Sequence, residues 1–248
     1  MAGKRRKPTL TSEESGAKKS KPSETMWSSS SGTGRKRSQG NSRSVAKSSL
    51  NEASITSMFD SLAEEDNPYV VSMEGITNLC ESLEIDPMED IRILVLLWKM
   101  GANAQPGHIN RDEWMKGCIQ LKADSIAKLK KLMPGLDVGF LERSEFKDFF
   151  KFCFQFNRQG THRTLDKELV IDLLRLVLKN QIPADRLSSY CTFLEGVTET
   201  ASQKITLDQW TSFLDFSYEY ESIDDYDEEN SAWPILIDDY VDYMKSSN

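Results

Sequence analysis

The side chains best suited to chemistry, the histidines and cysteines, are few and widely spaced in this chain of 248 residues. His108 follows a glycine and His162 lies in the polar stretch GTHRT, and neither belongs to a metal-binding HExxH motif. The sequence also lacks a GxSxG nucleophile motif, a P-loop and a glycine-rich dinucleotide motif. The sequence therefore predicts a protein that is not an enzyme and that uses no metal or other cofactor.

The four cysteines, Cys80, Cys118, Cys153 and Cys191, occur singly and form no CxxC pair. Cys153 lies inside the aromatic run FKFCFQF, where a core position is expected, because reactive thiols need electropositive and partly exposed surroundings. A pairing of Cys153 with His162 in space is the open alternative. The N-terminus begins with charged residues rather than an apolar signal, so we expect reduced cysteines in an intracellular protein.

Two links between predicted helices have a residue spacing like that of calcium-binding EF-hand loops, in which positions 1, 3, 5 and 12 supply oxygen ligands. With Glu74 or Glu113 at position 12, position 8 holds the apolar residue Val70 or Ile109. The ligand positions 1, 3 and 5 then hold Ala63, Glu65 and Asn67 in the first link, and Ala102, Ala104 and Pro106 in the second. Two interpretations stay open, an EF-hand-like scaffold or helix–loop–helix packing alone, and both predict no calcium binding.

The elements that carry these residues are predicted to be helices. Apolar residues recur at helical spacing in two early segments, at Ile55, Met58, Phe59 and Leu62 and at Ile76, Leu79, Cys80 and Leu83. The run Ile91–Trp98 is apolar almost all round, which predicts a buried central helix, with a buried strand as the alternative. Further helices are expected over 111–121, 124–132, 142–157, 166–179, 184–195, 207–219 and 235–244. No segment alternates as a half-buried strand, so the fold class is all-α.

Charge divides the chain into two parts. Residues 1–50 hold 12 Lys and Arg against 3 Asp and Glu, whereas residues 51–248 carry a net charge of −17. We expect residues 1–49, with their 13 serines, to be a disordered tail, and residues 50–248 to be the folded domain. The acidic domain would repel nucleic acid and attract a basic protein. No apolar run approaches the roughly 20 residues of a membrane span, so no membrane partner is expected.

The C-terminal segment is the most distinctive. Seven acids and no base occur in residues 219–230, and the stretch SAWP follows. Ser231 is predicted as the N-cap of a helix, with Pro234 in its first turn. That helix would place Asp238 and Asp242 on one face at i, i+4 spacing. The residues alone leave two interpretations open: a solvated acidic face, or a face that binds Lys and Arg.

The string YDEENSAWPILIDDYVDYM resembles the terminal motif of the defective-in-cullin-neddylation family, whose domain is called the potentiating-neddylation domain. The stretches EGITNLCESLEIDP, DSIAKLKKLMP and ITLDQWTSFLDF agree with it, so the resemblance spans roughly residues 55–245. It implies an all-helical, EF-hand-like fold without calcium. It also implies an adaptor that holds a cullin C-terminal domain and a conjugating enzyme together, so that a ubiquitin-like modifier transfers to the cullin.

The resemblance implies two binding sites. The family's cullin-binding trio falls on Asp208, Ala232 and Asp238, whose carboxylates would pair with basic cullin side chains. An apolar pocket would take the acetylated N-terminus of the neddylation-conjugating enzyme. Its residues would be Ile76, Ile93, Leu96, Leu97, Met100, Ile109, Phe156, Leu173 and Leu176. Leu173 stands where some relatives have a tyrosine, and two one-residue insertions disturb the register around this pocket.

The basic clusters of the tail suit nuclear import, the first of them being Lys4, Arg5, Arg6 and Lys7. We therefore expect the protein in the nucleus, with the cytoplasm as a second location. The family resemblance implies a cullin-RING ligase complex as its setting. The rival hypothesis is a nuclear regulatory protein whose tail binds DNA or RNA. A calcium sensor is the third.

Overall fold

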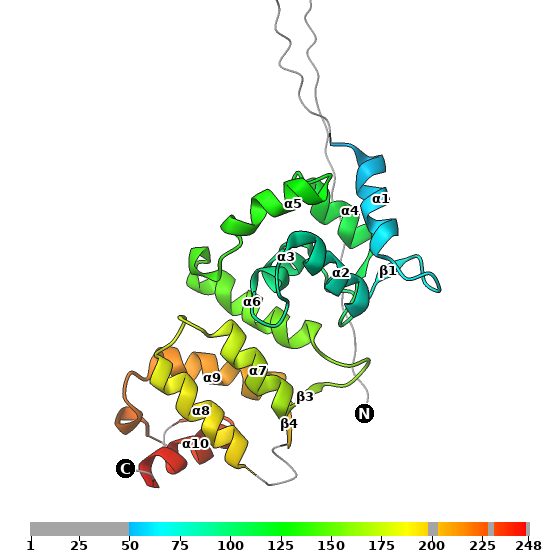
Figure 1. Ribbon diagram of the computed structural model, residues 1–248. Coiled ribbons are helices and arrows are strands. Elements are labelled where there is room, and N and C mark those ends of the chain that lie inside the picture. The colour runs from blue at the N-terminus through cyan, green and yellow to red at the C-terminus, as the bar shows by residue number, and fades with distance from the viewer. Residues whose placement is uncertain (1–49, 198–202, 228–230, 247–248) are drawn as a thin grey trace, which may run out of the picture. The chain divides into compact units, whose positions relative to one another are not determined.

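Helices make up most of the backbone in the computed structural model, which describes residues 50–197, 203–227 and 231–246 (Figure 1). In those ranges the α-helices are α1 (Glu52–Leu62), α2 (Met73–Leu83), α3 (Arg92–Met100), α4 (Arg111–Gln120), α5 (Ile126–Leu132), α6 (Arg143–Phe156), α7 (Lys167–Val177), α8 (Ala184–Gly196), α9 (Leu207–Glu219) and α10 (Ile235–Ser246). Short 3-10 helices are η1 (Met133–Gly135), η2 (Val138–Phe140) and η4 (Ile223–Asp225). The predicted helical class is confirmed, whereas the predicted tail and its Lys4–Lys7 cluster lie outside the described residues.

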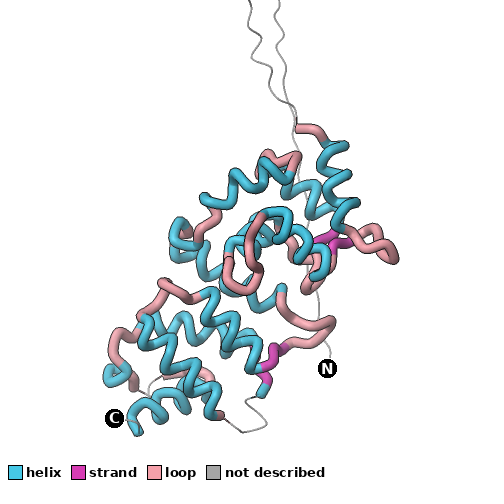
Figure 2. Tube along the Cα trace, viewed as in Figure 1, coloured by secondary structure: helices cyan, strands magenta, loops and turns pink. Residues whose placement is uncertain are grey.

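Four short strands in the described part of the chain correct the expectation that it forms none. They are β1 (Val70–Val71), β2 (Ile109–Asn110), β3 (Thr164–Asp166) and β4 (Lys204–Thr206). They pair as two antiparallel ribbons, β1 with β2 and β3 with β4 (Figure 2). Segments of two or three residues are too short for alternation to stand out in a sequence. Each strand leads within one residue into a helix, namely α2, α4, α7 or α9.

The first ribbon corrects the alignment of the two EF-hand-like loops. Val71, which is fully buried, pairs with Ile109, whereas the half-buried Val70 pairs with Asn110. Val71 is therefore the counterpart of Ile109. Four residues later, Gly75 rather than Glu74 takes the place that Glu113 has in the second loop. The likeness to a pair of EF-hands stays a prediction.

Glu113 uses its carboxylate to close the second loop onto the start of α4. Its Oε1 accepts hydrogen bonds from the backbone N–H groups of Asn103, at 2.9 Å, and Ala104, at 2.8 Å. Its Oε2 accepts from the N–H of Asn110 at 3.0 Å, and the Asn110 side chain accepts from the Glu113 N–H in return. A charged acceptor that satisfies three backbone donors stabilises both the loop and the helix end. The oxygens that would face calcium in an EF-hand therefore bind the protein's own backbone.

We expect Glu113→Gln to destabilise the domain by about 2 kcal/mol, because an amide group cannot accept the hydrogen bonds that both carboxylate oxygens accept. For a domain of this size, that corresponds to a fall in Tm of roughly 4–8 °C in a thermal melt. Glu74→Gln is the matched control, since Glu74 is exposed at the start of α2. The control should change stability by less than about 0.5 kcal/mol. Equal melting of the two variants would contradict the role given to Glu113.

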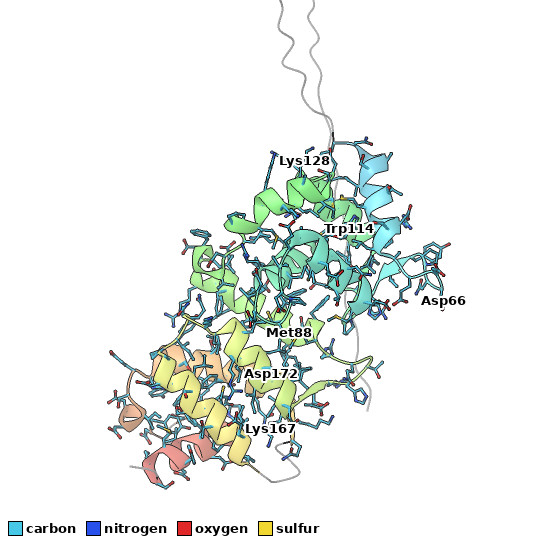
Figure 3. All side chains as sticks on the ribbon, in the orientation of Figure 1. Asp66, Met88, Trp114, Lys128, Lys167 and Asp172 are labelled. Carbon is cyan, nitrogen blue, oxygen red and sulfur yellow. The ribbon has the colours of Figure 1, made fainter. Side chains whose placement is uncertain are left out.

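The core of the N-terminal half forms around α3 and α4. Ile93 to Leu97 are all buried in α3, so the helical prediction for Ile91–Trp98 is confirmed and the strand alternative is wrong. Trp114 of α4, labelled in Figure 3, is fully buried, and its indole Nε1 donates to the Ile55 carbonyl at 3.3 Å. Gly117 lets α4 approach α3 closely, because a Cβ there would lie 2.6 Å from the Cβ of Met100.

Helix α6 contributes apolar side chains to both halves of the described domain and contacts α3 and α9. Phe150 stacks on Trp210 of α9 with ring centroids 4.2 Å apart. The Trp210 Nε1 donates to the Phe150 carbonyl at 2.9 Å. In the C-terminal half, Tyr190 of α8 stacks on Phe213 of α9 at 3.6 Å. These aromatic contacts fix α8 and α9 in place, and α10 packs on both of them.

The second ribbon joins the segments that lead into α7 and α9, which begin at its opposite ends. Thr164 pairs with Thr206 and Asp166 with Lys204, and the last two side chains also form a salt bridge. The next residue, Lys167 (Figure 3), is buried, and its Nζ donates to the Val197 carbonyl at 2.7 Å. The first residues of α7 and α9 are therefore held in a fixed relation to each other.

Candidate functional site

Helix α9 presents the first residue of the predicted acidic trio. Thr206 and Gln209 form a capping box, in which the Gln209 N–H donates to Thr206 Oγ1 at 3.2 Å and the Thr206 N–H to Gln209 Oε1 at 2.9 Å. Asp208 lies in the first turn and is exposed, whereas Trp210 is buried. A carboxylate is favoured there by the positive end of the helix dipole. The cap thus starts the helix so that Asp208 faces solvent.

The other two members lie at the start of α10. Ala232 is exposed, and the half-buried Trp233 packs on Phe216 and Tyr220 of the α9 end, with centroids 6.0 and 6.4 Å away. The helix begins at Ile235, so the prediction that Ser231 caps it is wrong. Pro234 directly precedes the helix, and its carbonyl accepts from the Ile237 N–H at 2.8 Å. Asp238 follows in the first turn and is half-buried.

The trio is spread over two packed helices rather than forming one hydrogen-bonded cluster. Helices α9 and α10 pack together through Phe213, Phe216 and Tyr240. Asp208 precedes Phe216 by eight residues, which is about 12 Å along the helix axis. Trp233 packs against that far end of α9. The two carboxylates are therefore carried by two different helices that pack on each other.

A hydrogen bond that sequence reasoning missed reaches Asp238 from the α9–α10 connection. The hydroxyl of Tyr226 donates to Asp238 Oδ1. The Tyr226 side chain is 5% exposed and lies edge-on to Phe216 and Tyr220. The signal available in the sequence was the tyrosine in the acidic string YDEE, which shares its motif with Asp238.

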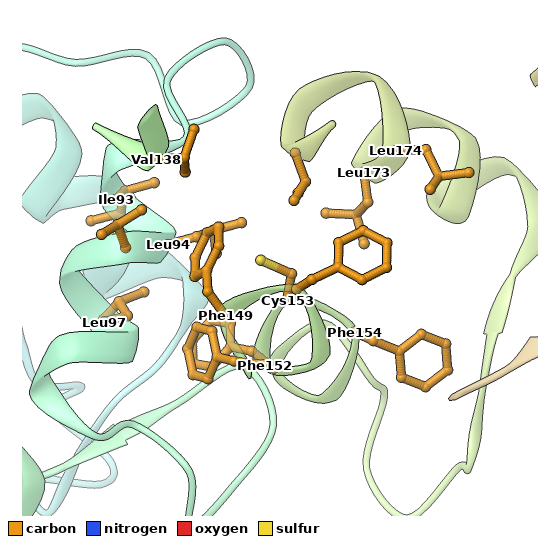
Figure 4. Packing of buried hydrophobic residues seen from close by; sticks show 14 of the residues in the cluster. Ile93, Leu94, Leu97, Val138, Phe149, Phe152, Cys153, Phe154, Leu173 and Leu174 are labelled. Atoms are coloured by element: carbon orange, nitrogen blue, oxygen red, sulfur yellow. The ribbon is translucent and has the colours of Figure 1, made fainter. Parts of the chain in front are cut away.

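The nine residues predicted to form the apolar pocket come from α2, α3, β2, α6 and α7. Leu176 is half-buried, and the other eight are buried in the hydrophobic core. Ile93 and Leu97 of α3 and Leu173 of α7 lie on opposite sides of the α6 residues Phe149 and Cys153 (Figure 4). The structure therefore places these three around α6 and buries them in the packed interior.

A cavity of about 150 Å³ lies beside one member of that set. Phe156 lines it together with Phe152, which stacks on Phe156 at 5.3 Å. The other lining residues are Gln155, Arg158 and the segment 102–106 of the second loop. The Gly107 N–H fixes this loop by donating to the Phe156 carbonyl at 2.7 Å. Sequence reasoning found Phe156 but missed the polar residues Gln155 and Arg158.

The four cysteines are free and buried, as predicted. Burial raises the pKa of Cys80 to about 11, with Asp90 and Asp86 adding to the effect, and the pKa of Cys191 also to about 11. Burial and then Asp124 raise the pKa of Cys118 to about 12. Complete burial holds the pKa of Cys153 well above its ordinary value. A thiol is nucleophilic as its thiolate, so these positions are unsuited to covalent chemistry near neutral pH.

Within the residues that the structure describes, no helix is both long enough and apolar enough to cross a membrane. Over the same residues, His, Cys, Asp and Glu side chains do not gather in groups of three that could hold a metal ion.

Comparison with known proteins assigns this part of the chain to a class. A family model described as "Cullin binding" matches residues 128–243, from α5 to α10, a stretch that contains Asp208, Ala232 and Asp238. The chain therefore carries a cullin-binding domain.

Curated relatives identify the family. The chain is similar to DCN1-like protein 5 of Homo sapiens, at 31% identity over 177 residues, which is 71% of each chain. It is also similar to DCN1-like protein 4 of Danio rerio, at 31% identity over 71% of this chain and 60% of the relative. For DCN1-like protein 3 of Drosophila melanogaster, the identity is 31% over 79% of this chain and 57% of the relative. The chain belongs to the family of DCN1-like proteins.

Proposed function

We propose that this protein is a non-catalytic adaptor for neddylation, which binds a cullin C-terminal domain and a modifier-charged conjugating enzyme at once. The observation that carries the proposal is the cullin-binding match over residues 128–243, which includes all three residues of the acidic trio. The exposed Asp208 and Ala232 and the half-buried Asp238 form the proposed cullin surface. Two carboxylates on an acidic body suit the binding of basic cullin side chains.

The adaptor would act by proximity and orientation, which raise the rate of modifier transfer without a catalytic group of its own. The burial and raised pKa values of the four cysteines support this part of the proposal. The rival hypothesis of a nucleic-acid-binding regulator gains no support from the relatives.

For the conjugating enzyme, the proposed site is the apolar region between α3, α6 and α7 together with the cavity beside Phe156. Ile93, Leu97 and Leu173 are packed in the core on either side of α6, so these side chains would have to move away from α6 to admit a peptide side chain. An acetylated N-terminus suits such a site, since it carries no charge to desolvate.

A reconstituted neddylation reaction tests the adaptor function. Adding the protein to a cullin C-terminal domain, charged conjugating enzyme and modifier should raise the initial rate of cullin modification at least about tenfold. An excess of acetylated peptide from the N-terminus of the conjugating enzyme should return the rate to its unassisted value, whereas the unacetylated peptide serves as the control. An unchanged rate, or modification of cullin by the protein without conjugating enzyme, would refute the proposal.

We further propose that Lys4–Lys7 direct the protein to the nucleus, with the cytoplasm as a second location and a cullin-RING ligase complex as its setting. Basic clusters of this kind suit nuclear import. Fluorescence of a tagged protein in which these four residues are alanine should shift to the cytoplasm, and an unchanged distribution would exclude the cluster.

A further inference from the structure

We propose that Tyr226 is a positioning residue for cullin binding, which holds the carboxylate of Asp238 in the orientation that a cationic partner requires. The inference rests on the proposed function, because it assigns a role to a residue behind the proposed cullin surface. Tyr226 belongs to the connection between α9 and α10, outside the acidic trio itself.

The hydroxyl of Tyr226 donates to one oxygen of Asp238, Oδ1. A carboxylate has about four acceptor directions, so the second oxygen keeps its capacity for a Lys or Arg of the partner. The half-buried Asp238 side chain is thereby restrained before the partner arrives. Restraint in the free protein lowers the entropy that association must overcome.

The ring of Tyr226 is itself fixed by its neighbours. It meets Phe216 at a centroid distance of 5.6 Å and Tyr220 at 5.4 Å, both in edge-to-face geometry. Trp233 packs on the same two rings from the α10 side. One aromatic cluster, made of Phe216, Tyr220, Tyr226 and Trp233, therefore holds both the start of α10 and the hydroxyl that binds Asp238.

Arg186 of α8 anchors the backbone that carries this cluster. Its guanidinium donates to the carbonyls of Tyr220, at 3.1 Å, and Glu221, at 3.0 Å. It also lies over the Phe216 ring, 5.3 Å from the centroid. The connection is thus attached to α8 just before Tyr226, and the position of the hydroxyl follows from the packing of the whole C-terminal half.

The first test is the Tyr226→Phe variant, which keeps the ring and removes the hydroxyl. Its affinity for a purified cullin C-terminal domain, measured by titration calorimetry, should fall about tenfold, because the Asp238 side chain then has to be ordered during association. Tyr220→Phe is the matched control, because the Tyr220 hydroxyl approaches Ser231 Oγ at 3.5 Å in the same aromatic cluster. The control should bind like the unmodified protein.

A double-mutant cycle separates positioning from a general effect on the fold. If Tyr226 acts through Asp238, the hydroxyl deletion should weaken binding about tenfold in the Asp208→Asn background and leave it unchanged in the Asp238→Asn background. Equal losses in both backgrounds, or full affinity of Tyr226→Phe, would overturn the inference.

The carboxyl ¹³C resonance of Asp238 in the free protein gives a readout independent of the partner. Tyr226→Phe should change the chemical shift of this resonance, and Tyr220→Phe should leave it unchanged. An unchanged chemical shift in Tyr226→Phe would overturn the inference. If unmodified protein fails to bind any cullin domain, the proposed function falls and the positioning role falls with it. If charge reversal at Asp238 abolishes binding while Tyr226→Phe is silent, the positioning role alone is refuted.

Discussion

Charge reversal at Asp238 or Asp208 is expected to weaken binding of a cullin C-terminal domain by at least about 100-fold while the domain stays folded. Each lysine would replace a carboxylate with a charge of the same sign as the basic partner. Removing one member of a close charge pair costs about 2–5 kcal/mol, and repulsion adds to that loss. Calorimetry or a pull-down with the purified cullin domain measures the effect.

The fold should tolerate both changes. Asp208 is exposed in the first turn of α9, where a lysine opposes the helix dipole and costs about 0.3–1 kcal/mol. Asp238 is half-buried, and Asp238→Lys also removes the oxygen that accepts the hydrogen bond of the Tyr226 hydroxyl. Circular dichroism melts should therefore show losses of a few degrees, well short of unfolding at 25 °C.

Asp242→Lys is the matched control for this experiment. Asp242 is exposed on α10, one helical turn beyond Asp238, and its reversal changes the net charge by the same amount. Long-range electrostatic attraction of the basic partner would be weakened equally in all three variants and would be screened by salt. Direct pairing predicts that Asp242→Lys keeps affinity within about threefold. Strong binding by the Asp208→Lys, Asp238→Lys double variant would remove the acidic trio from the interface.

The largest loss of stability is expected from Gly75→Ala. A Cβ at this position would lie 2.2 Å from the carbonyl oxygen of Leu62 and 2.6 Å from Val71 Cγ1. The first is a backbone atom at the end of α1, so relief requires α1 and α2 to move apart. We expect a cost of about 3 kcal/mol, the upper part of the range for overpacking, and a fall in Tm of roughly 6–12 °C.

Gly196→Ala provides the comparison, because Gly196 is the last residue of α8 and a Cβ there meets nothing within 4 Å. This change should stabilise the domain slightly, by up to about 1 kcal/mol, since alanine favours helix more than glycine does. Chemical denaturation of both variants measures the difference. Similar denaturation midpoints of the two variants would show that α1 and α2 can move apart at Gly75 with little loss of stability.

Periodicity predicted the helices well because most of them bury one continuous face. Ile91–Trp98 is the exception, because nearly every side chain is covered and the apolar run alone left a buried strand open as the alternative. The alignment of Val71 with Ile109 was out of reach, because β1 and β2 contain two residues each and their pairing is a contact between distant segments. The same reason hid Gly75 as the counterpart of Glu113.

The proposed binding residues divide in a similar way. Motif spacing placed Asp208, Ala232 and Asp238 on α9 and at the start of α10, and the family match includes them. Spacing could not reveal the hydrogen bond from Tyr226 to Asp238, because it joins residues that are 12 positions apart and belong to no common helix. For Leu173 and Ile93, apolar type alone cannot separate a residue that contacts a peptide from one that only fills the core.

The β3–β4 ribbon has a consequence for how the two proposed partners could be brought together. α7, which carries Leu173 and Leu176, begins directly after β3, and α9, which carries Asp208, begins directly after β4, at the opposite end of this antiparallel ribbon. Inserting or deleting one residue between Thr206 and Asp208 would turn the Asp208 side chain by about 100° around α9 and shift it by about 1.5 Å. The ribbon therefore fixes the angle between the proposed cullin and conjugating-enzyme sites. The adaptor function should tolerate insertions at this point far less well than substitutions.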